Sequence, residues 1–398
     1  SSGATVTIFE GRRNRRNVLR AVTAVAALAI TAPALSACGG SDSSSEAPSS
    51  SKKWVSAVSA DKGGGMDALE KDAKAEGTLN VIALPHNWSN YGQVIEGFKK
   101  KYPGIKVNEL NPNASSAEEI SAAKTNAGTN KAPDVFDLGI GVATTNTDKF
   151  APYKVASFND IPAGAKDSNG AFVGDYTGLM TLGYNKTKYG SIDVNNLKRS
   201  LSDPKFKGTV ALNGKPAEAG SAQNGFLAVN LNQGGSLDNF QPGLDFFKAL
   251  KDAGNLNTID VTDATIDSGQ TGVVFDWSYN QAAIKERLSK QQNVDWEVLT
   301  LPNGEVEQYY NQAVNKDAPH PAAARLWEEY LYSPDAQNEW MRGGAIPSLL
   351  EKMKKDGTVD KDALAKLPEI KKPVTYTSKQ ADAMTTWLGK NWPKTIGN

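Results

Sequence analysis

Apolar residues recur along the chain at two spacings, and from Thr78 onward these spacings alternate. Short apolar runs bounded by glycine or proline predict strands, and apolar residues three or four positions apart predict helices. In the first half the order is strand, helix, strand, helix, strand, at 78–85, 91–104, 105–111, 115–128 and 134–139. This order is typical of a largely parallel sheet flanked by helices.

The same alternation restarts in the second half of the chain. Strands are predicted at 208–214 and 272–278, and helices at 221–232, 237–254 and 321–332. We therefore predict an α/β fold of two lobes, each a mixed, largely parallel sheet flanked by helices, with a ligand cleft between them. Two extended, tyrosine-rich segments, 175–185 and 305–315, are predicted to cross between the lobes, and two such crossings make a hinge.

A basic and then apolar segment precedes the predicted lobes. Five arginines lie between residues 12 and 20, an apolar run occupies 21–34, and Leu35-Ser36-Ala37 precede Cys38, the only cysteine. This order resembles a bacterial lipobox, which implies that Cys38 is lipidated after the leader is removed. Arg15-Arg16 resembles a twin-arginine export motif, so the Sec and twin-arginine routes both stay open, as does the origin of residues 1–11.

These boundaries divide the chain into four parts. We expect a leader at 1–37, a lipidated Ser/Gly-rich tether at 38–65, lobe 1 at 66–178 and 305–345, and lobe 2 at 179–304 and 346–398.

Charge and composition exclude several function classes. The 44 basic and 44 acidic residues cancel, and without residues 1–37 the balance is 39 against 43, a net charge of −4. The sequence lacks the surplus of basic residues that is typical of nucleic-acid-binding proteins. One cysteine and two histidines supply neither a disulfide nor a metal site, and nucleophile, zinc and phosphate-loop motifs do not occur. We expect no cofactor, no metal and no enzymatic activity, with Glu328 and Glu329 solvated, although a carboxylate pair for glycoside cleavage has no fixed spacing.

Three segments resemble extracellular solute-binding proteins of bacterial ABC importers: 76–107, PDVFDLG at 133–139, and APHPAAARLWEEYLYSPDAQNEWMRGGAIP at 318–347. They resemble most the group with a two-strand hinge, which includes polyamine, ferric iron, thiamine and phosphonate binders. The resemblance implies a small-molecule solute, a permease with its ATPase as partners, and a monomer. It also implies a location on the extracellular face of the cell membrane, held there through Cys38. A lipoprotein that presents its ligand to a sensor, or a secreted hydrolase, is the alternative from another class.

Ligand in two-lobed α/β proteins lies at the carboxyl ends of strands and the first turns of the following helices. Ser221 opens a predicted helix, where capping of that helix is favoured over binding an anion. Asp276 and Trp277 are neighbours on the predicted strand, so their side chains point to opposite faces of the sheet. Both can face the cleft only if the strand has ended before them. The candidate ligand-binding residues are Trp88, Ser89, Asp137, Tyr176, Ser221, Asp276, Trp277 and Tyr279.

Carboxylates with tryptophan and tyrosine walls suit a cation, so putrescine or spermidine is the expected cargo. In the ferric iron binders that the chain resembles, adjacent tyrosines stand at this strand end and bind the metal. This chain has only Tyr279 there, with His86 as a further candidate ligand for iron. Strand alternation is expected to point the rings of Tyr309 and Tyr310 in opposite directions. Ferric iron, thiamine and phosphonate remain alternatives, and the sequence does not identify the permease-docking residues.

Overall fold

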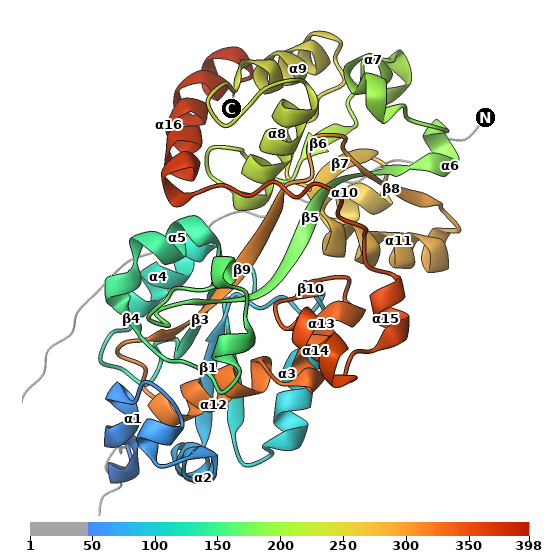
Figure 1. Ribbon diagram of the computed structural model, residues 1–398. Coiled ribbons are helices and arrows are strands. Elements are labelled where there is room, and N and C mark those ends of the chain that lie inside the picture. The colour runs from blue at the N-terminus through green and yellow to red at the C-terminus, as the bar shows by residue number, and fades with distance from the viewer. Residues whose placement is uncertain (1–46, 398) are drawn as a thin grey trace, which may run out of the picture. The chain divides into compact units, whose positions relative to one another are not determined.

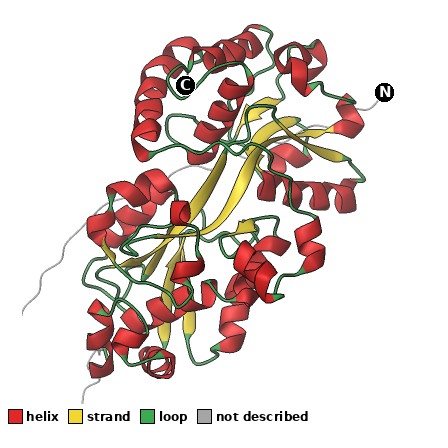
Figure 2. Cartoon of the chain, viewed as in Figure 1, coloured by secondary structure: helices red, strands yellow, loops and turns green. Residues whose placement is uncertain are grey.

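A computed structural model describes residues 47–397. Their strands form one two-stranded and one eight-stranded sheet, with helices on either side (Figures 1 and 2). The predicted leader, Cys38 and the first residues of the predicted tether lie outside the described residues. No helix within 47–397 is long and apolar enough to cross a membrane.

Lobe 1 contains a parallel strand pair and one part of the large sheet. Its strands are β1 (Thr78–Ile82), β2 (Lys106–Leu110), β3 (Val135–Leu138), β4 (Phe150–Ala151), β10 (Ile346–Pro347) and β9 (Glu307–Asn315). Its helices are α1 (Lys52–Ser56), α2 (Met66–Glu76), α3 (Tyr91–Lys101), α4 (Ser116–Thr125), α5 (Ile140–Thr145), α12 (Pro321–Leu331), α13 (Pro334–Arg342), α14 (Leu350–Asp356) and α15 (Lys361–Ala365). Local signals act as predicted: Ser115 caps α4 by accepting a hydrogen bond from Glu118 N.

Lobe 2 contains the other part of the large sheet. Its strands are β6 (Val210–Leu212), β7 (Val273–Trp277) and β8 (Trp296–Thr300). Its helices are α6 (Lys186–Tyr189), α7 (Leu197–Leu201), α8 (Gly220–Asn232), α9 (Gln241–Asp252), α10 (Asp263–Asp267), α11 (Ser278–Gln292) and α16 (Ser378–Thr395). Short 3-10 helices occur at Ser49–Ser51, Asp61–Gly63, Thr147–Lys149, Phe158–Asp160, Ala163–Ala165, Val194–Asn196 and Pro204–Phe206.

The long strand β5 (Val173–Asn185) belongs to both lobes. Its residues 173–179 pair with β9, and its residues 180–185 pair with β7 and β8. In Figure 1 β5 and β9 run side by side between the two groups of helices. The extended segments predicted at 175–185 and 305–315 are therefore present as β5 and β9.

A third connection accompanies these strands. Val374 forms a parallel bridge with Val306, and its carbonyl accepts a hydrogen bond from Glu307 N. The chain then enters α16, where Trp387 and Trp392 pack against Phe226 of α8. Sequence patterning missed this connection because the segment has no apolar periodicity.

Three expectations differ from the structure. The sheets are mixed, but "largely parallel" is wrong, because only β1–β2 and β6–β7 are parallel pairs and the long strands β5 and β9 run antiparallel to their neighbours. Folded structure begins before Met66, since Trp54 is fully buried and its indole N–H donates to Asp72 at 2.8 Å. Finally, β10 pairs with β5 at Tyr176 and Thr177, so the segment 346–365 lies with lobe 1 rather than lobe 2.

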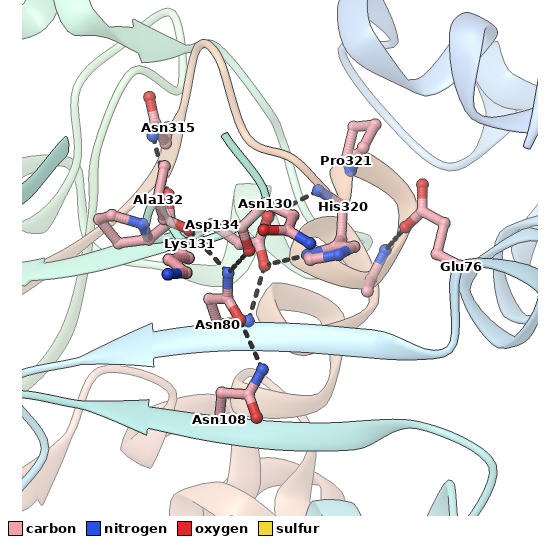
Figure 3. Close-up of polar contacts among 12 residues, drawn as sticks. Glu76, Asn80, Asn108, Asn130, Lys131, Ala132, Asp134, Asn315, His320 and Pro321 are labelled. Carbon is pink, nitrogen blue, oxygen red and sulfur yellow. Dashed lines mark hydrogen bonds and ion pairs between the residues drawn. The ribbon is translucent and has the colours of Figure 1, made fainter. Parts of the chain in front are cut away.

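A buried polar network joins β1, the start of β3 and the start of α12 (Figure 3). The fully buried Asp134 carboxylate accepts hydrogen bonds from Asn80 N at 2.6 Å and from His320 N at 2.7 Å, and it pairs with His320 Nδ1 at 2.8 Å. At the first turn of α12, the Glu76 carboxylate accepts from the backbone of Ala322 and Ala323. This network therefore fixes α12 against the strands of lobe 1.

Candidate functional site

The loop after β1 carries Trp88 into contact with β5. Ala83, Ser89 and Asn90 in this loop have φ values of 60°, 46° and 60°, a left-handed conformation that non-glycine residues adopt at an energetic cost. The Trp88 indole N–H donates to the Tyr176 hydroxyl at 2.8 Å. The strained loop therefore holds Trp88 and Tyr176 together on the lobe 1 side.

On the lobe 2 side, β7 ends at Trp277 and α11 begins at Ser278. Since the strand ends there, Tyr279 lies in the first turn of a helix rather than at the next alternating strand position. The rings of Trp277 and Tyr279 stack at 6.3 Å between centroids with an interplanar angle of 17°. The predicted strand end is thus the point where these aromatic side chains converge.

Rings from the two lobes meet in one cluster. Trp88 contacts Tyr279 at 5.5 Å and Tyr310 at 5.6 Å, and Tyr176 contacts the same two rings at 5.6 and 5.8 Å. We call Trp88, Tyr176, Trp277, Tyr279 and Tyr310 the aromatic cluster. Edge-to-face and stacked rings of this kind contribute about 0.5–1.5 kcal/mol per pair beyond the area they bury.

Tyr310 is the cluster member that sequence reasoning did not select. Tyr309 and Tyr310 do point in opposite directions, as expected, with Tyr309 next to Gly174 and Tyr310 in the cluster. The residue two positions further, Gln312, also reaches this region and donates to Asp175 at 2.8 Å. The alternation of Tyr310 and Gln312 along β9 was the signal that could have identified this face.

Two buried carboxyl groups lie at the cluster, one from each lobe. Asp137 Oδ2 lies 3.4 Å from the Tyr176 hydroxyl, and Asp276 directly precedes Trp277 at the end of β7. Burial, and then the negative charges of Asp137 and Asp276, raise the pKa of Tyr310. Burial raises the pKa of Asp137 to about 6 and that of Asp276 to about 6. The Asp276 carboxylate is held by Asn213 at 3.0 Å, Asn280 at 3.1 Å and Trp277 N at 2.7 Å.

Three buried polar atoms at this place have no hydrogen-bond partner within the described residues. They are Asp137 Oδ1, the indole nitrogen of Trp277 and the hydroxyl of Tyr279. Buried polar groups are nearly always paired, so an unpaired group needs a specific reason. Here one free acceptor, one free donor and one hydroxyl meet among stacked rings, an arrangement suited to a polar ligand with apolar parts.

The remaining candidates have different surroundings. Ser221 lies beside Tyr310, but Ala219 is the N-cap residue of α8 and no side chain caps it, so the favoured capping interpretation is wrong. The Ser89 hydroxyl is buried without a partner, and its backbone packs against Gly343. His86 is exposed and bonds Glu109 at 2.6 Å.

The expectation that Glu328 and Glu329 are solvated is wrong. Glu328 is buried, and Glu329 accepts from the Tyr153 hydroxyl at 2.8 Å and from Ala156 N at 3.0 Å. A separate surface hollow of ≈ 340 Å³ lies along α3 and α13, and its lining residues include Lys100, Lys101 and Glu339 but no member of the aromatic cluster.

Gly178 on β5 allows Tyr279 to approach. A Cβ at this position would lie 2.5 Å from Tyr279 Cε1, far inside contact distance. We expect Gly178→Ala to displace the ring and lower the free energy of unfolding by about 1–3 kcal/mol, with an accompanying loss of cargo affinity. Urea unfolding and calorimetry measure the two effects.

Gly389→Ala is the matched control, because a Cβ there meets no atom within 4 Å. Gly389 lies in the interior of α16, so alanine is expected to be neutral or slightly stabilising there. Equal behaviour of the two variants would contradict the role of Gly178.

Comparison with solved structures shows the same fold. A ferric binding protein from Campylobacter jejuni matches with a TM-score of 0.59 and 18% identity, covering 80% of this chain and 99% of that one. AfuA from Actinobacillus pleuropneumoniae, with fructose-6-phosphate bound, matches with a TM-score of 0.60 and 17% identity over 81% and 99%. A protein described as a spermidine/putrescine ABC transporter from Listeria monocytogenes matches with a TM-score of 0.53 and 16% identity over 79% and 99%.

No curated protein matches the sequence of this chain. A family model, described as bacterial extracellular solute-binding protein, matches residues 133–372. Because this match extends over more than half of the 398 residues, the chain belongs to the family of bacterial extracellular solute-binding proteins.

Proposed function

We propose that this protein is the substrate-binding lipoprotein of an ABC importer. It captures a small solute between its lobes and delivers the solute to a membrane permease that is driven by an ATPase. The order of basic, apolar and small residues before Cys38 supports export and lipid anchoring at that residue. Lobe 1 comprises 47–178 and 305–365, and lobe 2 comprises 179–304 and 366–397.

We place the cargo site at the aromatic cluster, together with Asp137, Asp276 and Ser221. The observation that carries this proposal is the meeting of rings from both lobes with buried carboxyl groups from both lobes. Cations bind over aromatic faces and pair with carboxylates, so a cationic amine of the putrescine or spermidine type fits best.

Closure of the lobes would couple binding to delivery. The connections at β5, β9 and Val374 can bend while each lobe keeps its own hydrogen-bonded strands. Because Trp88 belongs to lobe 1 and Tyr279 to lobe 2, their 5.5 Å contact exists only when the lobes are together. Cargo that bridges these rings would then favour the closed form, which the permease recognises.

Thermal unfolding tests the cargo assignment. The soluble form used should begin before Ala47, so that the segment around Ser51, whose hydroxyl bonds Glu76, is kept whole. Putrescine and spermidine are expected to raise the melting temperature as their concentration increases. The reason is that binding adds RT ln(1 + [L]/Kd) to the free energy of unfolding. A shift with ferric citrate, thiamine, a phosphonate or a sugar phosphate, and none with either amine, would overturn the proposed cargo.

A further inference from the structure

Two buried carboxyl groups form a pair directly behind the aromatic cluster in lobe 1. A single phenol hydroxyl contacts both Asp137 and Asp175: Tyr91 OH lies 2.6 Å from Asp137 Oδ2 and 3.5 Å from Asp175 Oδ2. Gln312 donates to Asp175 Oδ2 at 2.8 Å, and the backbone N–H of Tyr176 donates to Asp175 Oδ1 at 2.6 Å. Two carboxyls this close cannot both be ionised, so the pair keeps a proton.

An irregular strand position creates this pair. The register between β5 and β9 shifts between Gly174 and Thr177, so Asp175 and Tyr176 lie where the ladder is interrupted. Such bulges redirect side chains that regular alternation would send to opposite faces. Here Asp175 reaches the row formed by Asp137 and Gln312, while the Tyr176 ring remains in the aromatic cluster.

The pair is connected to the cluster by hydrogen bonds. Trp88 donates to the Tyr176 hydroxyl at 2.8 Å, and that hydroxyl lies 3.4 Å from Asp137 Oδ2. Asp137 Oδ1 has no partner within residues 47–397, whereas both oxygens of Asp276 are bonded within lobe 2. Of the two carboxyls at the cluster, only Asp137 therefore has an oxygen free for a ligand.

The surroundings of the pair contain acids and phenols from five elements. Tyr91 lies on α3, Glu119 on α4, Tyr176 on β5, Tyr310 on β9 and Glu328 on α12, and Tyr332 directly follows α12. Burial raises the pKa of Glu119 and of Glu328 well above the usual range, which favours the neutral form of both side chains. No salt bridge within the described part of the chain joins a lysine or arginine to Asp137 or Asp175. The positive charge of Arg325 lowers the pKa of Glu328, although burial raises that pKa by more.

We propose that Asp137 is the anchor for the positive charge of the cargo and that the cargo and a second proton compete for it. Asp175 is the positioning residue that holds the proton which the pair always keeps. This proposal rests on the proposed function, since it requires a cationic cargo. In the singly protonated pair, Asp175 donates to the ionised Asp137, which presents Oδ1 to the cation. In the doubly protonated pair Asp137 is neutral and offers no charge.

The consequence is a binding affinity that falls in acid. Burial raises the pKa of Asp137 to about 6, so the cargo meets an ionised carboxylate above this pH and a proton competitor below it. One competing proton weakens the affinity by the factor 1 + 10^(pKa − pH), so Kd is expected to rise about fivefold from pH 6 to pH 5 and to approach a tenfold rise per pH unit only in stronger acid. At pH 5.5 binding should release about three-quarters of a proton to the buffer, and at pH 7.5 almost none.

Isothermal titration of putrescine into the whole protein, at several pH values and in two buffers of different ionisation enthalpy, measures both quantities. Asp137→Asn mimics the protonated side chain and is expected to bind weakly at every pH, with a flat profile. Asp175→Asn keeps a donor towards Asp137 and should keep the midpoint near that of the wild type. Asp175→Ala removes the donor that stabilises the ionised Asp137, so its midpoint should move to higher pH.

Asp276→Asn is the matched control, because burial also raises the pKa of Asp276 to about 6. It is expected to keep the pH slope, whatever it does to the affinity. A slope that disappears in Asp276→Asn and persists in Asp137→Asn would overturn the assignment to Asp137. Binding of putrescine without a slope in the wild type would overturn the proton competition alone, and no binding at pH 7.5 would overturn the proposed cargo together with it.

Discussion

Replacing Tyr279 by alanine is expected to weaken cargo binding about 100-fold, because buried aromatic anchors carry more than 2 kcal/mol of binding energy. The Tyr279 ring contacts Trp88, Tyr176 and Trp277, so it belongs to the centre of the aromatic cluster. Without this ring, one wall of the site and the contact between the lobes are both lost. Calorimetry with putrescine measures the loss, and circular dichroism checks that the variant is folded.

Tyr279→Phe separates the hydroxyl from the ring. The hydroxyl of Tyr279 is buried without a partner, so its removal should not destabilise the free protein, while cargo affinity should fall about tenfold if the hydroxyl bonds the cargo. Tyr189→Phe is the control, since the Tyr189 hydroxyl is also buried without a partner and its ring packs on Phe206 in lobe 2. An unchanged affinity in Tyr279→Ala would remove the aromatic cluster from the binding site.

Replacing Asp134 by alanine is expected to lower the free energy of unfolding by about 3–5 kcal/mol, the usual cost of removing one partner of a buried ion pair. Asp134 is fully buried, and its loss leaves the N–H groups of Asn80 and His320 and the His320 imidazole without an acceptor (Figure 3). Asp134→Asn keeps one acceptor oxygen and should cost less. Urea unfolding at pH 6 measures the difference.

The control is Asp148→Ala. The side chain of Asp148 is 79% exposed, so its loss should change the free energy of unfolding by less than about 0.5 kcal/mol, as is usual for surface substitutions. Asp134→Ala should leave the aromatic cluster in place, because none of its partners belongs to that cluster. If both variants unfold at the same urea concentration, the network in Figure 3 does not stabilise α12 as proposed.

Local physical chemistry made many helices and strands predictable. The strand predicted at 78–85 is β1, and the helix before it, α2, ends at Gly77 in a left-handed residue with φ 70°. Capping at Ser115 and apolar spacing in α12 were equally readable, since both depend on residues a few positions apart. The third connection through Val374 was not readable, because it is held by one bridge to a distant strand.

The candidate site was predicted in part for the same reason. Trp88, Asp137, Trp277 and Tyr279 follow strands that periodicity identifies, and the structure brings their elements together at one place. Tyr310 and Asp175 were not selected, because their contribution depends on the β9 register and on the irregularity in β5. Alternation along β9 indicates that Tyr310 and Gln312 share a face, but the register of β9 and the irregularity in β5 leave no local signal.

The sequence by itself determined the residue types of the site, most of the elements that carry them and the α/β class, because periodicity, caps and turn residues act over short range. Only the tertiary structure decided which side chains meet. The pairing of β5 with β9 and then with β7 joins residues far apart in the sequence, such as Val173 with Gln312 and Met180 with Trp277. This pairing sets Tyr176, Tyr279 and Tyr310 around Trp88. It also decided the charge of the site, since burial, which no local pattern measures, raises the pKa of Asp137 and Asp276.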